Sequence, residues 1–125
     1  MEFLTRKMVM HGQLNARGSL FGGQCLSWID EEAAIAAISA LKSNYIVTKY
    51  ISKIDFKSPA RLGDIVEIGT RVVKCGTTSI TISCTIRNMT SGQEIITVDE
   101  IVFVHVDEHG RPKPHGVSRV WNTSW

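Results

Sequence analysis

The sequence is poor in cysteine, and its cysteines are not arranged as metal ligands or as a disulfide framework. The 125 residues include Cys25, Cys75 and Cys84, an odd number without a CxxC pair. This spacing argues against the common structural zinc motifs and is typical of free thiols in a reducing compartment. The histidines are His11, His105, His109 and His115. None of them shows metal-ligand spacing, so we expect no metal, and surface or hydrogen-bonded roles for all of them.

The sequence also lacks long apolar runs and a strong charge of either sign. No run approaches the roughly 18 apolar residues of a membrane span, and the start MEFLTRKMVMHGQL lacks the apolar core of a signal peptide. The 14 basic residues against 12 acidic ones leave a net charge of +2. That excess is too small to favour nucleic acid as a partner, although it allows a local basic patch for a phosphorylated ligand. We expect a cytoplasmic protein without membrane or nucleic-acid partners.

The composition that remains is that of one globular domain. Apolar residues make up 43% and charged residues 21% of the chain, which is ordinary for a folded protein. A domain of this length buries about two thirds of the surface that its unfolded chain exposes, so it needs no disulfide or metal to fold. We expect residues 1–118 to form the domain and residues 119–125, with Trp121 and Trp125, to form a polar tail.

The pattern of apolar residues predicts one helix and several strands. Residues 22–41 are rich in alanine and contain no proline, and no glycine after Gly23, which favours a helix that Asn44 could cap. Residues 2–9 are typical of an edge strand. The other strand-like segments are 45–56, 65–73, 80–87 and 94–106. Short connections between them indicate antiparallel neighbours, so we predict an α+β fold with one helix on one antiparallel sheet.

The predicted helix is apolar on most of its circumference. On a wheel at about 100° per residue, Trp28, Ile35 and Ile38 lie opposite a broad apolar face, so the helix needs cover from a curved sheet or a second subunit. The broad face consists of Leu26, Ile29, Ala33, Ala34, Ala36, Ala37, Ala40 and Leu41. Asp30 falls inside this face, where a carboxylate is costly unless it is hydrogen-bonded, paired or close to water. It is either a buried residue bonded to a loop amide or part of a functional site.

A motif at the start of the helix resembles a known family. Residues 15–23 follow the pattern Asn-x-x-Gly-x-x-Phe-Gly-Gly, and Asp30 comes seven residues after the last glycine. This spacing resembles the acyl-CoA hydrolase branch of the hot-dog superfamily, which includes the bacterial YciA-like thioesterases and the mammalian cytosolic acyl-CoA hydrolases. The resemblance continues in residues 56–64, 76–79 and 106–110. It implies a curved antiparallel β-sheet of five or six strands wrapped around one long central α-helix.

The resemblance also implies an activity and its site. It implies an acyl-CoA thioesterase with the dimer as minimal unit, often assembled as a trimer of dimers, in which Asp30 of one subunit faces Asn15 of the other. Asp30 would act as general base or as a nucleophile that forms a transient anhydride. Gly22 and Gly23 would offer unpaired helix-start amides to the oxyanion, and Asn15 would orient the water or the carbonyl. The simpler alternatives are close packing for the glycines and an Asx turn for Asn15.

Coenzyme A carries phosphate groups, so basic side chains are expected near the mouth of such a site. The basic candidates are Lys57, Arg61, Lys74 and Arg87. Residues 76–79 match a family segment that lies along the pantetheine or nucleotide, although many members carry an arginine where this chain has threonine. The expected substrate-binding residues are Lys57, Ser58, Arg61, Gly76, Thr77 and Thr78. No cofactor is expected beyond coenzyme A as a part of substrate and product.

Other functions of the same fold remain as alternatives. A non-catalytic acyl-CoA sensor is the main one, but such sensors usually carry a separate DNA-binding segment, which we do not expect here. A hot-dog hydratase needs a Gly-Asp-x-Asn-Pro-x-His setting, which this sequence lacks. The 4-hydroxybenzoyl-CoA type carries its acid in a different N-terminal motif, which is also missing.

Overall fold

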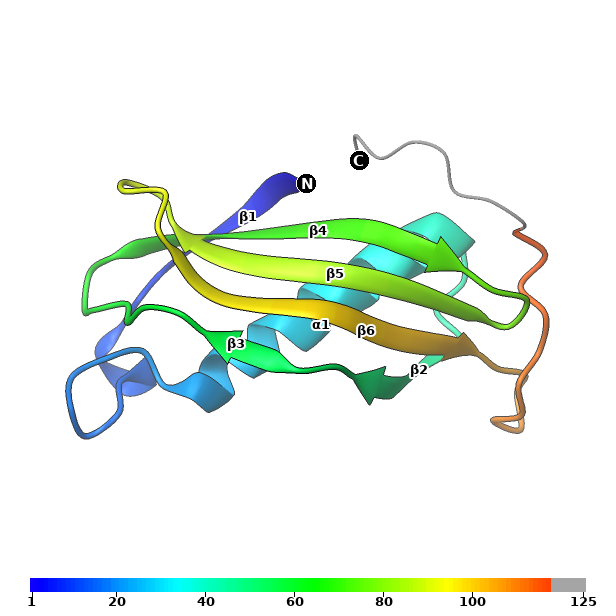
Figure 1. Ribbon diagram of the computed structural model, residues 1–125. Coiled ribbons are helices and arrows are strands. Elements are labelled where there is room, and N and C mark those ends of the chain that lie inside the picture. Colours follow the sequence, from blue (N-terminus) through cyan, green and yellow to red (C-terminus); the bar gives the residue numbers. More distant parts are fainter. Residues whose placement is uncertain (118–125) are drawn as a thin grey trace.

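The computed structural model describes residues 1–117. In this part of the chain, one long helix lies across one face of a twisted sheet (Figure 1). The strands are β1 (Glu2–Met8), β2 (Ile46–Ile51), β3 (Ile54–Phe56), β4 (Ile65–Cys75), β5 (Ser79–Asn88) and β6 (Glu94–His105). The helices are a short 3-10 turn, η1 (His11–Gln13), and α1 (Gly22–Leu41). The predicted tail 119–125, with Trp121 and Trp125, lies outside the described residues, as does the predicted boundary at 118.

The sheet has the order β1-β4-β5-β6-β2, and β3 pairs with β6 beside β2. Every pair of strands is antiparallel. The predicted α+β fold is therefore confirmed, with the helix over the residues expected for it and β1 at an edge. The opposite edge consists of β2 and β3, and Figure 1 shows β3 beside the start of α1.

The segment 45–56 is two strands, where the sequence pattern predicted one. The break falls at Ser52, whose N–H donates to the Glu100 carbonyl at 2.8 Å while its hydroxyl accepts from the Glu100 N–H at 2.9 Å. Opposite this break, Asp99 and Glu100 of β6 face the single residue Ser83 of β5, which is a β-bulge. The kink in β6 divides its neighbour into β2 and β3, so five strands follow the helix instead of the predicted four.

The core lies between α1 and the inner face of the sheet. Ala33 and Ala37 are fully buried, and they share one apolar cluster with Ile29, Ile82 and Ile101. Because alanine side chains are small, the helix approaches the sheet closely, and each buried isoleucine contributes about 2 kcal/mol of hydrophobic stabilisation. The prediction of a helix buried on its broad face is confirmed for these residues.

Two details of the helix differ from the prediction. Trp28, which the wheel placed on the other side, is 93% buried, and the Lys7 ammonium lies 5.7 Å from the centroid of its ring, within reach of a cation–π interaction. The helix ends at Lys42, not through Asn44, because Lys42 adopts the left-handed conformation (φ 54°) and its N–H donates to the Ile38 carbonyl at 2.7 Å. Ile35 is exposed on the far side, as the wheel indicated.

Candidate active site

The loop before α1 is folded around the side chain of Asn15. The Asn15 Oδ1 atom accepts the N–H groups of Arg17 at 2.9 Å and Ser19 at 3.1 Å, and the Asn15 N–H donates to the Ser19 carbonyl at 2.7 Å. This is the Asx turn that was one of the two interpretations of Asn15. It occupies the side-chain oxygen only, so the Nδ2 group remains a donor for a ligand.

The start of α1 leaves its first amides without acceptors. Phe21 is the N-cap residue and provides no side-chain cap, and its carbonyl accepts only the later N–H groups of Gln24 and Cys25. Within residues 1–117, neither the Gly22 nor the Gly23 N–H has a hydrogen-bond acceptor. These amides therefore lie at the positive end of the helix dipole and are free to bind a developing negative charge.

Aromatic rings lie against both glycines. A Cβ atom on Gly22 would approach the Phe56 ring to 3.2 Å, and one on Gly23 would approach the Phe21 ring to 2.8 Å. Both rings are more than half exposed, 55% for Phe21 and 58% for Phe56. The glycines thus have a packing role as well, since any side chain at position 23 would displace an aromatic ring at the start of the helix.

A groove of about 380 Å³ runs beside this helix start. It is lined by Asn15, Ser19, Leu20, Gly22, Cys25, Phe56, Lys57, Ser58, Pro59, Ala60 and Ile95. Its floor is apolar, because Leu20, Cys25 and Ile95 are buried. The groove therefore brings together four predicted site residues from three separate segments: Asn15, Gly22, Lys57 and Ser58.

Lys57 and Ser58 are held at the rim by Glu94, at the start of β6. The Lys57 Nζ lies 2.9 Å from a carboxylate oxygen of Glu94, and this hydrogen bond and the charge of Glu94 raise the pKa of Lys57. The Ser58 hydroxyl donates to the Glu94 carbonyl at 2.6 Å. Arg61 is exposed, and its backbone N–H donates to the Asp64 carboxylate at 2.9 Å. Within residues 1–117, its guanidinium has no hydrogen-bond or ion-pair partner.

Asp30 lies on the third turn of α1, beside the edge strand β2. It is half-buried, not enclosed in the apolar face as the wheel suggested. Its Oδ1 atom accepts a hydrogen bond from the Thr48 hydroxyl of β2 at 3.0 Å, in an exposed position. Neither a loop amide nor a basic residue shares this carboxylate in the described part of the chain. The sequence offered no signal for Thr48, because the contact depends on how β2 meets the helix.

Asp30 is distant from the helix-start amides of its own chain. Asp30 follows Gly23 by seven residues, which corresponds to about 10 Å of helical rise. Asp30 is not a lining residue of the groove that contains Asn15 and Gly22. One thioester carbonyl cannot contact the Asp30 carboxylate and the Gly23 amide of the same chain at once.

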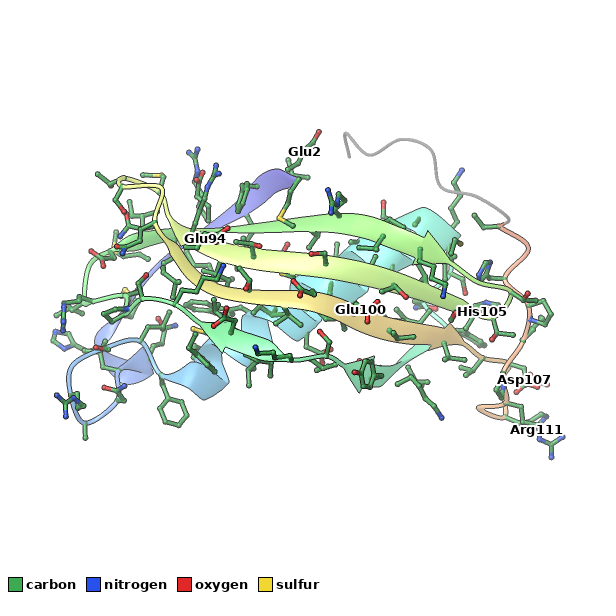
Figure 2. The ribbon with its side chains drawn as sticks, viewed as in Figure 1. Glu2, Glu94, Glu100, His105, Asp107 and Arg111 are labelled. Carbon is green, nitrogen blue, oxygen red and sulfur yellow. The ribbon has the colours of Figure 1, made fainter. Side chains whose placement is uncertain are left out.

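The predicted binding turn 76–78 lies at the other end of the sheet. Figure 2 shows Glu94 at one end of β6 and His105 at the other. Lys57 binds Glu94, whereas the Thr78 carbonyl accepts the His105 N–H at 2.7 Å. The 12 residues of β6 span about 35 Å. Within one chain, the predicted substrate-binding residues therefore form two separate groups.

Two of the basic candidates, Arg87 and Lys74, do not line the groove. Arg87 is bound to Glu67 at 3.0 Å and its guanidinium stacks 3.6 Å from the centroid of the Phe3 ring. Arg6 binds the other oxygen of Glu67 at 3.1 Å, so this buried glutamate, which sequence reasoning did not single out, ties β1 to β4 and β5. Lys74 is exposed on β4. Arg87 thus has a structural role, and the expectation that it binds phosphate finds no support in its position.

Alternative site chemistries can be compared with the same geometry. Cys25 lines the groove, but burial raises the pKa of its thiol to about 11, so it is a poor nucleophile at neutral pH. In residues 1–117, no three His, Cys, Asp or Glu side chains are grouped as metal ligands. None of the helices in this part of the chain has the length and apolarity to cross a bilayer.

Comparisons with known proteins show the family and the fold of the chain. Residues 17–95 match the thioesterase superfamily. The chain is 33% identical over 119 residues to the acyl-CoA thioester hydrolase YciA of Salmonella typhimurium, and the match covers 90% of this chain and 89% of that protein. The chain belongs to the thioesterase superfamily. Within this superfamily it is similar to the YciA-like acyl-CoA thioester hydrolases, as the motif at residues 15–30 indicated.

Solved thioesterases share the fold of this chain. A hexameric hot-dog thioesterase of Campylobacter jejuni superposes with a TM-score of 0.77 and 30% identity, over 90% of its chain and 91% of this one. A hexameric broad-specificity acyl-coenzyme A thioesterase, solved as a mutant with one aspartate replaced by alanine, gives a TM-score of 0.82 and 27% identity over 90% of its chain and 98% of this one. The prediction of a hot-dog thioesterase fold is thereby confirmed.

Proposed function

We propose that this thioesterase-superfamily protein hydrolyses acyl-CoA to a free acid and coenzyme A, with Asp30 as its catalytic carboxylate. The observation that carries the proposal is the Asp30–Thr48 hydrogen bond at 3.0 Å, which holds a half-exposed carboxylate on a helix that is otherwise largely apolar. Thr48 occupies one oxygen of Asp30 and leaves the second for water or substrate. The relatives that hydrolyse acyl-CoA supply the substrate class.

The chemistry follows from a carboxylate placed next to water. As general base, Asp30 would take a proton from the attacking water, the thioester C–S bond would break, and the leaving thiolate of coenzyme A would take up a proton. As nucleophile, Asp30 would attack the thioester carbonyl and the C–S bond would break, so that the coenzyme A thiolate leaves and takes up a proton. Water would then hydrolyse the acyl anhydride formed on Asp30. Both routes develop negative charge on the thioester oxygen. The free N–H groups of Gly22 and Gly23 and the Nδ2 group of Asn15 are suited to bind that charge.

The proposed site needs two subunits. The distance of about 10 Å between Asp30 and the Gly23 amide along one helix is too long for a shared carbonyl. The edge formed by β2 and β3 carries exposed apolar side chains, and a free strand edge of this kind favours pairing with a second copy. These side chains are Val47, Tyr50, Ile51 and Phe56, together with Tyr45 directly before β2. We infer a dimer in which Asp30 of one subunit meets Asn15 of the other, assembled further as a trimer of dimers, in line with the hexameric relatives.

Antiparallel pairing of two copies through this edge also accounts for the two groups of substrate-binding residues. It would bring the Lys57 end of one subunit toward the turn 76–78 of the other, since these segments lie at opposite ends of β6. Lys57, Ser58 and Arg61 would then bind coenzyme A together with Gly76, Thr77 and Thr78. Coenzyme A is the only cofactor in this proposal, and the free cysteines fit a reducing cytoplasm.

The activity is tested by release of free thiol from a panel of acyl-CoA substrates. We expect turnover by the wild type and a loss of kcat of about 100-fold or more in Asp30→Asn, the range of a lost general base. Glu31→Gln is the matched control, because Glu31 is the exposed neighbour on the same helix. Full activity of Asp30→Asn would remove the catalytic assignment. Tight binding of coenzyme A without any turnover would favour a non-catalytic sensor.

The two-subunit site is tested by mixing inactive variants. Asp30→Asn and Asn15→Ala subunits are unfolded together and refolded as a mixture. A heterodimer then contains one site with both substitutions and one site with neither, so roughly a quarter of the wild-type activity returns at equal mixing. A mixture that stays as inactive as its two components, in spite of mixed dimers seen by mass spectrometry, would contradict a site shared between subunits.

A further inference from the structure

The chain after β6 folds back on the sheet as a short strap, which we define as residues 111–117. The turn before it is closed by the Asp107 carboxylate, which accepts the N–H groups of His109 at 2.8 Å and Arg111 at 3.0 Å. These hydrogen bonds lower the pKa of Asp107. Figure 2 shows Asp107 and Arg111 just beyond His105 at the end of β6. The Lys113 N–H then donates to the His105 carbonyl at 2.9 Å. Because of this hydrogen bond, the strap lies beside the turn between β4 and β5.

The strap and β6 together bind three consecutive carbonyls of the β4–β5 turn, which we define as residues 76–79 and which includes the first residue of β5. The Thr77 carbonyl accepts the His115 N–H at 3.2 Å, and the Thr78 carbonyl accepts the His105 N–H at 2.7 Å. The Ser79 carbonyl lies 3.0 Å from the Nε2 atom of the His115 ring. The carbonyls of residues 77–79 therefore all accept hydrogen bonds from the strap or from β6.

The ring of His115 has a defined tautomer. Its Nδ1 atom accepts the Val117 N–H at 3.0 Å, so the proton of the neutral ring is on Nε2, which donates to the Ser79 carbonyl. Cys75 lies 3.7 Å from Nε2, but its thiol donates to the Val117 carbonyl at 3.2 Å and burial raises its pKa. His115 has no free lone pair for that thiol, so the two residues do not form a nucleophilic dyad.

The direction of the carbonyls decides where the amides point. In a planar trans peptide, the N–H of Thr78 is directed opposite to the carbonyl of Thr77. With the Thr77 carbonyl bound to the strap, the Thr78 N–H faces away from it. Within residues 1–117, the N–H groups and hydroxyls of Thr77 and Thr78 have no acceptor. The turn therefore directs the Thr78 N–H away from the strap, and in this described part of the chain the Thr77 N–H and both hydroxyls are unpaired donors of the same turn.

The turn is also tight. The Gly76 N–H donates to the Ser79 carbonyl at 2.9 Å, so this carbonyl receives hydrogen bonds from both Gly76 and the His115 ring. A Cβ atom at position 76 would lie 2.5 Å from the Ser79 Oγ, so any other residue there would require the Ser79 hydroxyl to rotate. The shape of the turn thus depends on one interaction from within and one from the strap.

We propose that His115 is a positioning residue for substrate binding, which acts through the β4–β5 turn. Its ring holds the Ser79 carbonyl and its backbone N–H holds the Thr77 carbonyl. Together they direct the Thr78 N–H, and the unpaired donors beside it, toward the phosphate or amide groups of coenzyme A. This proposal rests on the proposed function, since it assigns the outward donors of the turn to acyl-CoA. It adds a strap residue, remote from Asp30, that governs affinity and not the chemical step.

The test compares three substitutions of His115 with a control. His115→Ala removes the ring. His115→Gln keeps an N–H donor at about the place of Nε2, within reach of the Ser79 carbonyl, whereas His115→Asn keeps an acceptor for the Val117 N–H but loses that donor. His109→Ala is the matched control, because the His109 side chain is exposed and contacts only the exposed Glu108. Melting temperature and oligomeric state are measured first for every variant.

The expected result is a split between affinity and turnover. In His115→Ala and His115→Asn, the KM for acyl-CoA and the Kd for free coenzyme A rise about tenfold, the effect of losing one or two ordered donors, while kcat stays within about twofold. His115→Gln returns toward the wild type, and His109→Ala equals it. Hydrogen exchange at the Gly76 amide becomes faster in His115→Ala, because its acceptor carbonyl is no longer held.

Several outcomes would overturn the proposal. One is an unchanged KM in His115→Ala, and another is a fall of kcat with no change in KM. If a folded His115→Gln protein binds coenzyme A as weakly as His115→Ala does, the contact with the Ser79 carbonyl does not contribute to binding. A wild type that neither hydrolyses acyl-CoA nor binds coenzyme A would instead reject the proposed function, and the exchange rate at Gly76 would still report whether the strap orders the turn.

Discussion

The Thr48 hydroxyl donates a hydrogen bond of 3.0 Å to the Asp30 carboxylate and so joins the third turn of α1 to the edge strand β2. The pairing of β2 with β6 shifts register between Thr48 and Tyr50, which is a β-bulge at this point of the edge. Bulges commonly redirect a side chain next to a functional site. The direction of the Asp30 carboxylate therefore depends on an irregularity in a neighbouring strand.

Thr48→Val removes the donor to Asp30 and keeps the shape of the side chain. Because a hydrogen bond to a charged group contributes about 1.5–3 kcal/mol, we expect kcat to fall roughly tenfold or more, with little change in KM. Thr48→Ser is the control, since it retains the hydroxyl. Steady-state kinetics of the two variants decide the matter. Equal kcat values for Thr48→Val and the wild type would mean that Thr48 does not position the carboxylate.

Asn15 has a structural oxygen and a free amide nitrogen, and two substitutions separate them. Asn15→Asp keeps the Oδ1 acceptor of the Arg17 and Ser19 amides and removes the Nδ2 donor. We expect it to retain the melting temperature and to lose most of kcat. Asn15→Ala should lose activity and also about 1–2 kcal/mol of stability, as two hydrogen bonds disappear. Thermal denaturation and turnover are measured on both, and an active Asn15→Asp would leave Asn15 with its loop role alone.

Glu67 should make the stability of the protein depend on pH in the acid range. The hydrogen bond from Arg87, followed by that from Arg6, lowers the pKa of this carboxyl below its ordinary value of 4.5. A folded-state pKa below the unfolded one gives stability that is present above pH 4.5 and is lost as the pH falls through the folded value. Glu67→Gln should therefore be less stable than the wild type at neutral pH, and the difference should shrink in acid.

Urea denaturation of both proteins at neutral and at acid pH measures this difference. Glu108→Gln serves as the control, because the exposed Glu108 contacts only His109. A Glu67→Gln variant with the same deficit at every pH would mean that packing, and not charge, explains the effect.

The small alanine side chains of α1 allow the sheet to approach closely and so set the distance between helix and sheet. Ala37 is fully buried against the sheet, so Ala37→Leu should overpack the core and cost about 1–3 kcal/mol of stability. Ser39→Leu, at an exposed position two residues later on the same helix, should cost far less. The free energy of unfolding is measured by denaturant titration for both. A stable Ala37→Leu protein would contradict the view that small residues set the distance between helix and sheet.

Much of the fold was predictable because its signals are local. The alanine-rich segment gave the helix bounds, and the alternation in residues 80–87 gave β5. The split of 45–56 was not predictable, because its cause is the bulge at Asp99 and Glu100 in a strand more than 40 residues away. Local propensity is equally high on both sides of Ser52, so only the pairing with β6 reveals the break.

The candidate site was predictable in its residues but not in its arrangement. The spacing of residues 15–30 placed Asn15, the helix-start glycines and Asp30 in one motif, and of these Asn15 and Gly22 line the groove. The same pattern put Asp30 inside an apolar face, whereas the structure leaves it half-exposed beside Thr48. A helical wheel assumes that one whole side of the helix is covered equally. The sheet, however, ends at the edge strand β2, and Asp30 lies beside that edge.

By itself, the sequence determined the helix, the antiparallel strands, the motif and hence the superfamily, because each depends on residues that are close along the chain. Only the tertiary structure decided that Thr48 reaches Asp30, that Arg87 is bound to Glu67, and that His115 holds the β4–β5 turn. These contacts join segments 18, 20 and 36 residues apart. Bulges, strand edges and the return of the chain after β6 set those distances, and no local pattern encodes them.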